Sequence, residues 1–189
     1  MLARMGEAMS KGNGYLTSKQ VWTELLAPEE LQKIVAALSP PSRALWDHPP
    51  LAVAWLPRQH TIEFAIRAHE QLGERALSLA HEAARRMVHK DFTGIYRALI
   101  RLATVDYVLS KAMKYYDQYT RDSGTLIAKR TGPKSTFNRY EGLPDATEID
   151  CWFLGGAGLG ILELVGASGA QVTRRSLLPD GVIELAYAW

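Results

Sequence analysis

The sequence has little of several features that would indicate a specialised class of protein. It contains one cysteine, Cys151, which excludes an intramolecular disulfide framework and a zinc site built from cysteine pairs. Its 22 Lys and Arg nearly balance its 20 Asp and Glu, and this balance argues against nucleic acid as a partner. The N-terminal residues lack the apolar core of a signal peptide because Arg4, Glu7 and Lys11 interrupt it. These absences predict a cytoplasmic protein.

Motifs that carry chemistry are also scarce. The sequence has neither a Gly-x-Ser-x-Gly elbow nor a His-Glu-x-x-His zinc motif, and the glycines between Gly155 and Gly160 do not have the spacing of a dinucleotide-binding fingerprint. Cys151 begins an apolar helix, where a thiol either packs as a small apolar group or gains reactivity from a lowered pKa; we favour packing. We therefore predict that the protein is not an enzyme and holds no metal.

What is present is the composition of an ordinary globular domain, with 47% hydrophobic and 22% charged residues. Residues 1–14 contain glycine and serine without apolar periodicity, and they predict a flexible lead-in to a single domain over 15–189. Apolar residues at helical spacing predict helices, which cover 18–26, 28–38, 61–72, 74–88 and 93–119. The last of these is the longest, and we expect it to be the central helix of the core.

After Ser123-Gly124 the pattern changes to the alternation of strands. Strands are expected over 125–131, 135–140, 171–177 and 182–189, with one apolar helix from Glu148 to about Ala167. The predicted fold class is α+β, with an N-terminal helical bundle followed by strand–strand–helix–strand–strand forming an antiparallel sheet. In the last strand, Ile183, Leu185, Tyr187 and Trp189 are expected on one face.

The segment from Trp152 to Ala170 contains one charged residue, Glu163, and approaches the length of a membrane span. Because a patterned strand follows at once, we predict a buried core helix and no transmembrane segment. Gly156 and Gly160 lie one turn apart and predict a flat face against which another element packs closely. We expect Glu163 at the edge of this helix, paired with a surface Lys or Arg, since a carboxylate in so apolar a helix needs a partner.

A group of basic residues is the feature of the expected protein surface that most suggests a binding role. Lys129, Arg130, Lys134 and Arg139 lie on the first hairpin, where they predict a surface for an anion or a protein partner. The alternative is a solvated strand face whose charges protect an exposed edge. The sequence does not choose between the two.

The C-terminal segments Cys151–Gly156, Gly160–Glu163 and Ile183–Trp189, with Val165-Gly166 between them, resemble those of a family of uncharacterised paralogous myxobacterial proteins. That family is similar to the superfamily of haem-NO/oxygen-binding domains, four-vinyl-reductase domains and Bet-type subunits of the TRAPP tethering complex. The resemblance implies the same order of elements, with a cavity between helices and sheet that takes haem, a small aromatic effector or a lipid chain.

The site residues of that superfamily do not match this sequence. Its haem-binding members place a His late in the helix before the first hairpin and carry a Tyr-x-Ser-x-Arg motif, and residues 93–119 contain no His. The zinc-binding members use several cysteines, which Cys151 alone does not replace. We therefore predict no cofactor, with haem and zinc both disfavoured.

The leading functional hypothesis is a non-catalytic sensory or regulatory module that binds an apolar small molecule or a lipid in this cavity. Aromatic size and position on an apolar face suggest the lining residues, which are Tyr96, Leu99, Ala103, Tyr107, Met113, Trp152 and Phe153. The alternative is a homodimeric adaptor or scaffold that contacts a regulatory protein partner through an exposed helix face or the basic hairpin.

Overall fold

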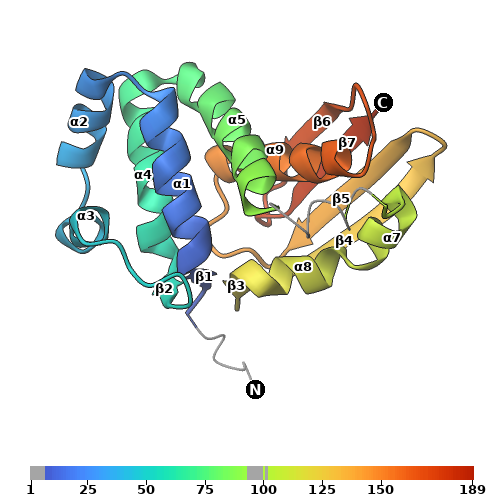
Figure 1. Ribbon diagram of the computed structural model, residues 1–189, viewed down its shortest axis with the longest axis horizontal. Coiled ribbons are helices and arrows are strands. Elements are labelled where there is room, and N and C mark those ends of the chain that lie inside the picture. Colours follow the sequence, from blue (N-terminus) through green and yellow to red (C-terminus); the bar gives the residue numbers. More distant parts are fainter. Residues whose placement is uncertain (1–6, 93–99, 101) are drawn as a thin grey trace.

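The computed structural model describes residues 7–92, 100 and 102–189. Helices occupy most of the first two thirds of the chain. Among the described residues the helices are α1 (Gly12–Leu25), α2 (Pro28–Ala36), α3 (Pro40–Asp47), α4 (Arg58–Leu72), α5 (Glu74–Asp91), α7 (Val105–Ser110), α8 (Ala112–Tyr119) and, nearer the C-terminus, α9 (Glu148–Leu164). In Figure 1, α1 to α4 form one half of the molecule and a four-stranded sheet the other, with α5 and α9 between them.

The four-stranded sheet consists of two hairpins that lie side by side. Its strands are β4 (Thr125–Gly132), β5 (Ser135–Glu141), β6 (Gln171–Leu177) and β7 (Ile183–Ala188), in the antiparallel order β4-β5-β7-β6. On β7, Ile183, Leu185 and Tyr187 are all at most 1% exposed, so the expected alternation places these side chains in the core. The predicted α+β class and the antiparallel sheet are confirmed.

A smaller sheet joins three segments that are far apart in the sequence. The strands β1 (Met9–Lys11), β2 (Trp55–Pro57) and β3 (Thr120–Arg121) pair in the order β2-β1-β3. Met9 lies opposite both Pro57 and Arg121. Residues 9–14, which we assigned to a flexible lead-in, therefore form β1 and the first residues of α1. Strands of two or three residues are too short to show an alternation of apolar and polar residues in the sequence. They are defined by their pairing with neighbouring strands.

The expected central helix over 93–119 is wrong where the structure describes it. Residues 93–99 and 101 lie outside the described residues, and residues 102–104 are not helical. The helix α7 begins after Thr104, whose side-chain oxygen accepts a hydrogen bond from the backbone N–H of Tyr107 at 3.1 Å. A second helix, α8, begins after Lys111. Helical spacing of apolar residues continued across both breaks and did not reveal them.

The helix pair α5–α9 takes the central place instead. A Cβ added to Gly156 of α9 would lie 1.9 Å from the backbone oxygen of His81 on α5, and one added to Gly160 would lie 3.0 Å from that of Arg85. The expected flat glycine face is therefore confirmed, and α5 is the element that lies on it. In the part of the chain that the structure describes, no helix has the length and apolar character needed to cross a membrane.

A missed helix, α3, explains how the proline-rich segment is held. Pro40 and Pro41 occupy its first turn, where a missing N–H is tolerated. Glu63 of α4 accepts hydrogen bonds from the backbone N–H and the hydroxyl of Ser39, at 2.8 and 2.6 Å, and from the hydroxyl of Ser42. Burial raises the pKa of Glu63, but these hydrogen bonds outweigh it and bring that pKa to about 2.

Substituting Glu63 with Gln is expected to make stability less dependent on acid pH. The pKa of Glu63 is 4.5 in the reference state and about 2 in the fold, so its stabilising contribution is complete above pH 4.5 and is lost as the pH falls towards 2. The shift corresponds to about 3 kcal/mol. Urea unfolding should therefore show that E63Q has a lower free energy of unfolding than the wild type at neutral pH. The difference between the two free energies should become smaller near pH 2. The exposed Glu70→Gln is the control, and an equal loss in both variants would contradict the prediction.

Candidate ligand-binding cavity

A cavity of about 320 Å³ lies between the helices and the four-stranded sheet. Its walls come from α1, α4, α5, α7, α8 and α9, and its floor from the inward faces of β4 and β5. Apolar side chains from the helices and from β4 make up most of the lining, including Trp22, Ile62, Phe64, Ala65, Met87, Val88, Phe92, Val105, Val108, Leu109, Leu126, Phe153, Leu154, Ala157, Ile161 and Leu162. A volume and lining of this kind suit a small, mainly apolar ligand.

Tyrosine phenols supply much of the polarity in the cavity wall. Tyr15, Tyr115, Tyr116, Tyr119 and Tyr140 all line it. Burial raises the pKa of Tyr15, Tyr116 and Tyr119 to about 12 in each case. These phenols are therefore neutral at physiological pH, and that of Tyr116 donates a hydrogen bond to the carbonyl oxygen of Ser123 at 2.9 Å.

Asp91 at the end of α5 is a second polar group of the lining. Its carboxylate accepts a hydrogen bond from the hydroxyl of Thr17 at 2.7 Å and another from Tyr119. Burial raises the pKa of Asp91, and these hydrogen bonds counteract the increase. Asp91 thus ties α5 to α1 and α8 around one end of the cavity.

Of the residues expected to bind a ligand, Phe153 lines this cavity. Met113 lies against β4, where its sulfur accepts a hydrogen bond from the backbone N–H of Leu126 at 3.1 Å. Tyr107 is 52% exposed, and Ala103 packs beside the cluster of Ile100, Val108 and Leu164. Tyr96 and Leu99 fall outside the described residues, and whether any of these residues binds a ligand stays a prediction.

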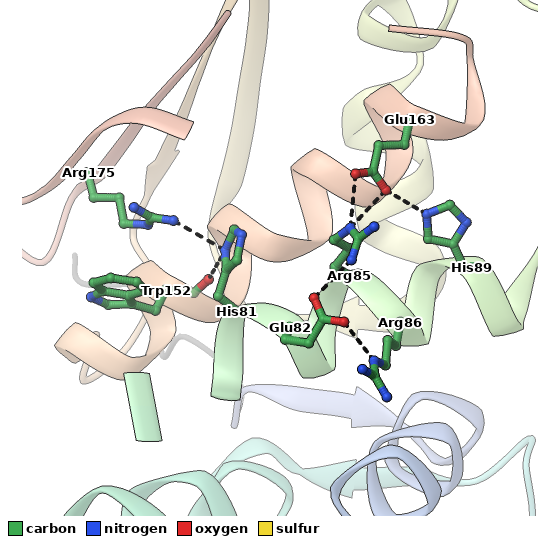
Figure 2. Close-up of polar contacts among 8 residues, drawn as sticks. All are labelled: His81, Glu82, Arg85, Arg86, His89, Trp152, Glu163 and Arg175. Atoms are coloured by element: carbon green, nitrogen blue, oxygen red, sulfur yellow. Dashed lines mark hydrogen bonds and ion pairs between the residues drawn. The ribbon is translucent and has the colours of Figure 1, made fainter. Parts of the chain in front are cut away.

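Trp152 does not line this cavity but forms part of a separate cluster at the junction of α5, α9 and β6 (Figure 2). The guanidinium of Arg175 lies over its indole ring, 4.1 Å from the ring centroid. The Nδ1 atom of His81 lies 3.3 Å from the Trp152 carbonyl oxygen and 3.3 Å from Nη2 of Arg175. Burial and the charge of Arg175 lower the pKa of His81, which favours the neutral imidazole.

Glu163 lies at the edge of α9, as the sequence predicted. Both its oxygens are 2.9 Å from Nε of Arg85, and Oε2 is 2.8 Å from Nε2 of His89 (Figure 2). Its side chain is 24% exposed. These contacts fasten the second half of α9 to α5.

Cys151 packs as the sequence analysis favoured. Its side chain is buried, and burial raises the pKa of its thiol to about 11. The thiolate is therefore scarce at neutral pH, and this environment does not support a nucleophilic role.

The basic hairpin is partly neutralised by nearby acids. Arg139 pairs with Glu141 and Glu184, and Arg130 lies 3.4 Å from Asp106. Lys129 lies over the ring of Phe137, 5.4 Å from its centroid. Lys134 is exposed at the turn. The role of these four residues as a surface for an anion or partner stays a prediction, as does the homodimer.

Sequence reasoning missed the polar residues of the cavity floor. Thr136, Asn138 and Tyr140 alternate along β5, face inward and line the cavity. The signal was present, because a strand in the middle of a sheet with polar residues on its core-facing side is unusual. It was not recognised since neither face of this strand is apolar throughout.

The described helices, with the glycine-packed α5–α9 pair among them, lie over the two hairpins and enclose a central cavity, which defines an α+β fold. The same fold occurs in solved H-NOX structures. The Fe(II) unliganded H-NOX protein from K. algicida is 11% identical, covers 94% of this chain and 95% of its own, and has a TM-score of 0.66. An H-NOX structure from a study of haem distortion is 14% identical over 94% and 92% of the two chains, with a TM-score of 0.65.

A third solved structure, an oxygen-binding H-NOX domain related to soluble guanylate cyclases, is 14% identical over 93% of this chain and 89% of its own, with a TM-score of 0.56. No protein-family model matches the sequence, and no curated protein matches it. At these identities the likeness establishes the fold.

The likeness contradicts our prediction that the domain has no cofactor and that haem is disfavoured. That prediction relied on the missing His and the missing Tyr-x-Ser-x-Arg motif, whereas solved structures with this fold are haem proteins. Motif absence is a weak argument here because haem iron also accepts tyrosine and methionine as ligands. The cavity lining contains both residue types.

Proposed function

We propose that this domain is a small-molecule-binding sensory module whose ligand occupies the cavity between the helices and the sheet. The observation that supports the proposal is the cavity itself, which has a volume of about 320 Å³ and a mainly apolar lining. A well-packed core leaves few voids larger than a water molecule. A central cavity of this size is therefore better explained by an occupant than by incomplete packing.

Haem is the specific occupant that the solved H-NOX structures suggest. The apolar walls suit a flat macrocycle, and the donors able to hold iron among the described lining residues are the tyrosine phenols and the thioether of Met87. Lys11, which also lines the cavity, would attract a carboxylate of the macrocycle. When bound, haem would supply an iron atom that coordinates a diatomic gas.

We expect the purified protein to take up one equivalent of hemin, seen as a Soret band that shifts from that of free hemin. Ala157 of α9 lines the cavity, and Ala157→Phe would occupy part of the space. This variant should bind hemin at least about tenfold more weakly because the macrocycle and the ring compete for one volume. Absorbance titration measures both affinities.

The matched control is Ala52→Phe, which adds the same ring at an exposed loop residue. It should bind hemin like the wild type. Equal hemin affinity in all three proteins would mean that binding takes place outside the cavity. The proposed function would be wrong if hemin and an aromatic compound such as naphthol both failed to bind and both left the melting temperature of the protein unchanged.

A further inference from the structure

The floor of the cavity is polar, although its walls are mainly apolar. Thr136, Asn138 and Tyr140 occupy alternate positions on β5, so their side chains share its inward face. Thr136 is 1% exposed, Asn138 9% and Tyr140 4%. Burying polar groups is unfavourable unless they form hydrogen bonds, so a row of three such residues requires partners.

Asn138, in the middle of this row, has only part of its hydrogen-bonding capacity satisfied. Its amide lies near the phenol groups of Tyr140 and Tyr187 and partly offsets the rise that burial causes in the pKa of each phenol. The amide oxygen Oδ1 is buried and has no hydrogen-bond partner in the part of the chain that the structure describes. Buried carbonyl oxygens without a partner are rare, and each calls for an explanation.

The surroundings of Asn138 limit where a partner can come from. Across the sheet, Asn138 lies opposite Ala128 of β4 and Leu185 of β7. Neither of these side chains can donate a hydrogen bond, and the hydroxyl of Tyr187 donates to the carbonyl oxygen of Leu154 at 3.4 Å. The remaining side of Asn138 borders the cavity.

We propose that the ligand of this cavity is an apolar ring compound carrying an O–H or N–H group that donates a hydrogen bond to Asn138 Oδ1. The inference rests on the proposed function and adds the chemical class of the ligand. The apolar walls hold the ring, and the polar floor selects the end of the molecule that carries the donor.

A pair of probes that differ only in the donor tests this directly. Naphthol carries an O–H group that can donate a hydrogen bond. Its methyl ether has the same ring system, but a methyl group replaces the hydroxyl hydrogen, so it has no donor. Isothermal titration of the wild-type protein should show naphthol binding about tenfold more tightly than the ether, because the ether leaves a buried acceptor without a partner. Equal affinities would overturn the inference.

Two variants locate the preference at Asn138. Asn138→Leu removes the acceptor at nearly constant volume, and the ratio of the two affinities should fall to about one. Thr131→Val makes a similar polar-to-apolar change at an exposed residue of β4 outside the cavity lining; it is the control and should keep the tenfold ratio. A ratio that survived in N138L would assign the preference elsewhere and overturn the inference.

The outcomes also separate this inference from the proposed function. Binding of hemin or of both naphthalene probes without any preference for the donor would leave the proposed function standing and contradict the role of Asn138. Failure of hemin and of both probes to bind would contradict both. Should Asn138→Leu fail to fold, Asn138→Ala removes the same acceptor and takes its place in the comparison.

Discussion

Replacing Gly156 with Ala is expected to destabilise the protein by about 3 kcal/mol or more and to lower its melting temperature by roughly 10 °C. The new Cβ would lie 1.9 Å from the backbone oxygen of His81 and 2.7 Å from its carbonyl carbon. Both atoms belong to the backbone of α5, so no side-chain rotation relieves the clash. The two central helices would have to move apart, and the cavity walls that they carry would move with them.

Two further glycines turn this prediction into a graded series. Gly160→Ala places its Cβ 3.0 Å from the Arg85 oxygen, and Gly14→Ala finds its nearest neighbour at 3.6 Å, the side chain of Tyr119. We expect an intermediate loss for G160A and no loss for G14A, since alanine favours a helix by up to about 1 kcal/mol over glycine. Chemical denaturation ranks the three variants, and equal stability of G156A and G14A would contradict the packing argument.

Replacing Asp150 with Ala is expected to cost about 4 kcal/mol of stability. Its carboxylate pairs with the guanidinium of Arg58, and each residue is only 8% exposed. Asp150 also closes the N-terminus of α9, because it accepts hydrogen bonds from the backbone N–H and the hydroxyl of Thr147 at 2.9 and 2.7 Å. The substitution leaves a buried cation without a counter-charge and removes a helix cap.

A double-mutant cycle separates the two roles of Asp150. Combining Arg58→Met with Asp150→Leu removes both charges, so the double variant should be more stable than the sum of the single losses implies. Asp150→Asn keeps a side-chain oxygen that can accept the hydrogen bonds from Thr147 at the N-terminus of α9, and it removes only the negative charge. Strictly additive losses in the cycle would show that the pair contributes no coupling energy, contrary to this prediction.

The order and type of most elements could be predicted from local sequence. The helices at 61–72 and 74–88 and all four strands of the larger sheet lie within a few residues of α4, α5 and β4 to β7. Each is bounded by a glycine or proline, and α4, α5 and β7 add a clear apolar period; both signals are local. Where one of them failed, as at Thr104 and Lys111, the prediction joined two helices into one.

The site was harder to predict because no single segment contains it. The cavity is assembled from helices and strands spread from α1 to α9, and each contributes a few side chains. Apolar size selected Phe153, which lines the cavity, and also Tyr107, which is half exposed. The polar floor on β5 was missed since its meaning depends on which side of the strand faces the helices.

The sequence by itself determined the α+β class, the two hairpins and the glycine face of α9, because apolar periodicity and turn residues act over neighbouring residues. Only the tertiary structure decided that α5 packs on that face, that β1 joins β2 and β3, and that a cavity remains above β5. The lone cysteine, read from the sequence as an argument against zinc, is a buried thiol outside the described cavity lining. Long-range packing decides such features, since each depends on contacts between residues that the sequence places far apart.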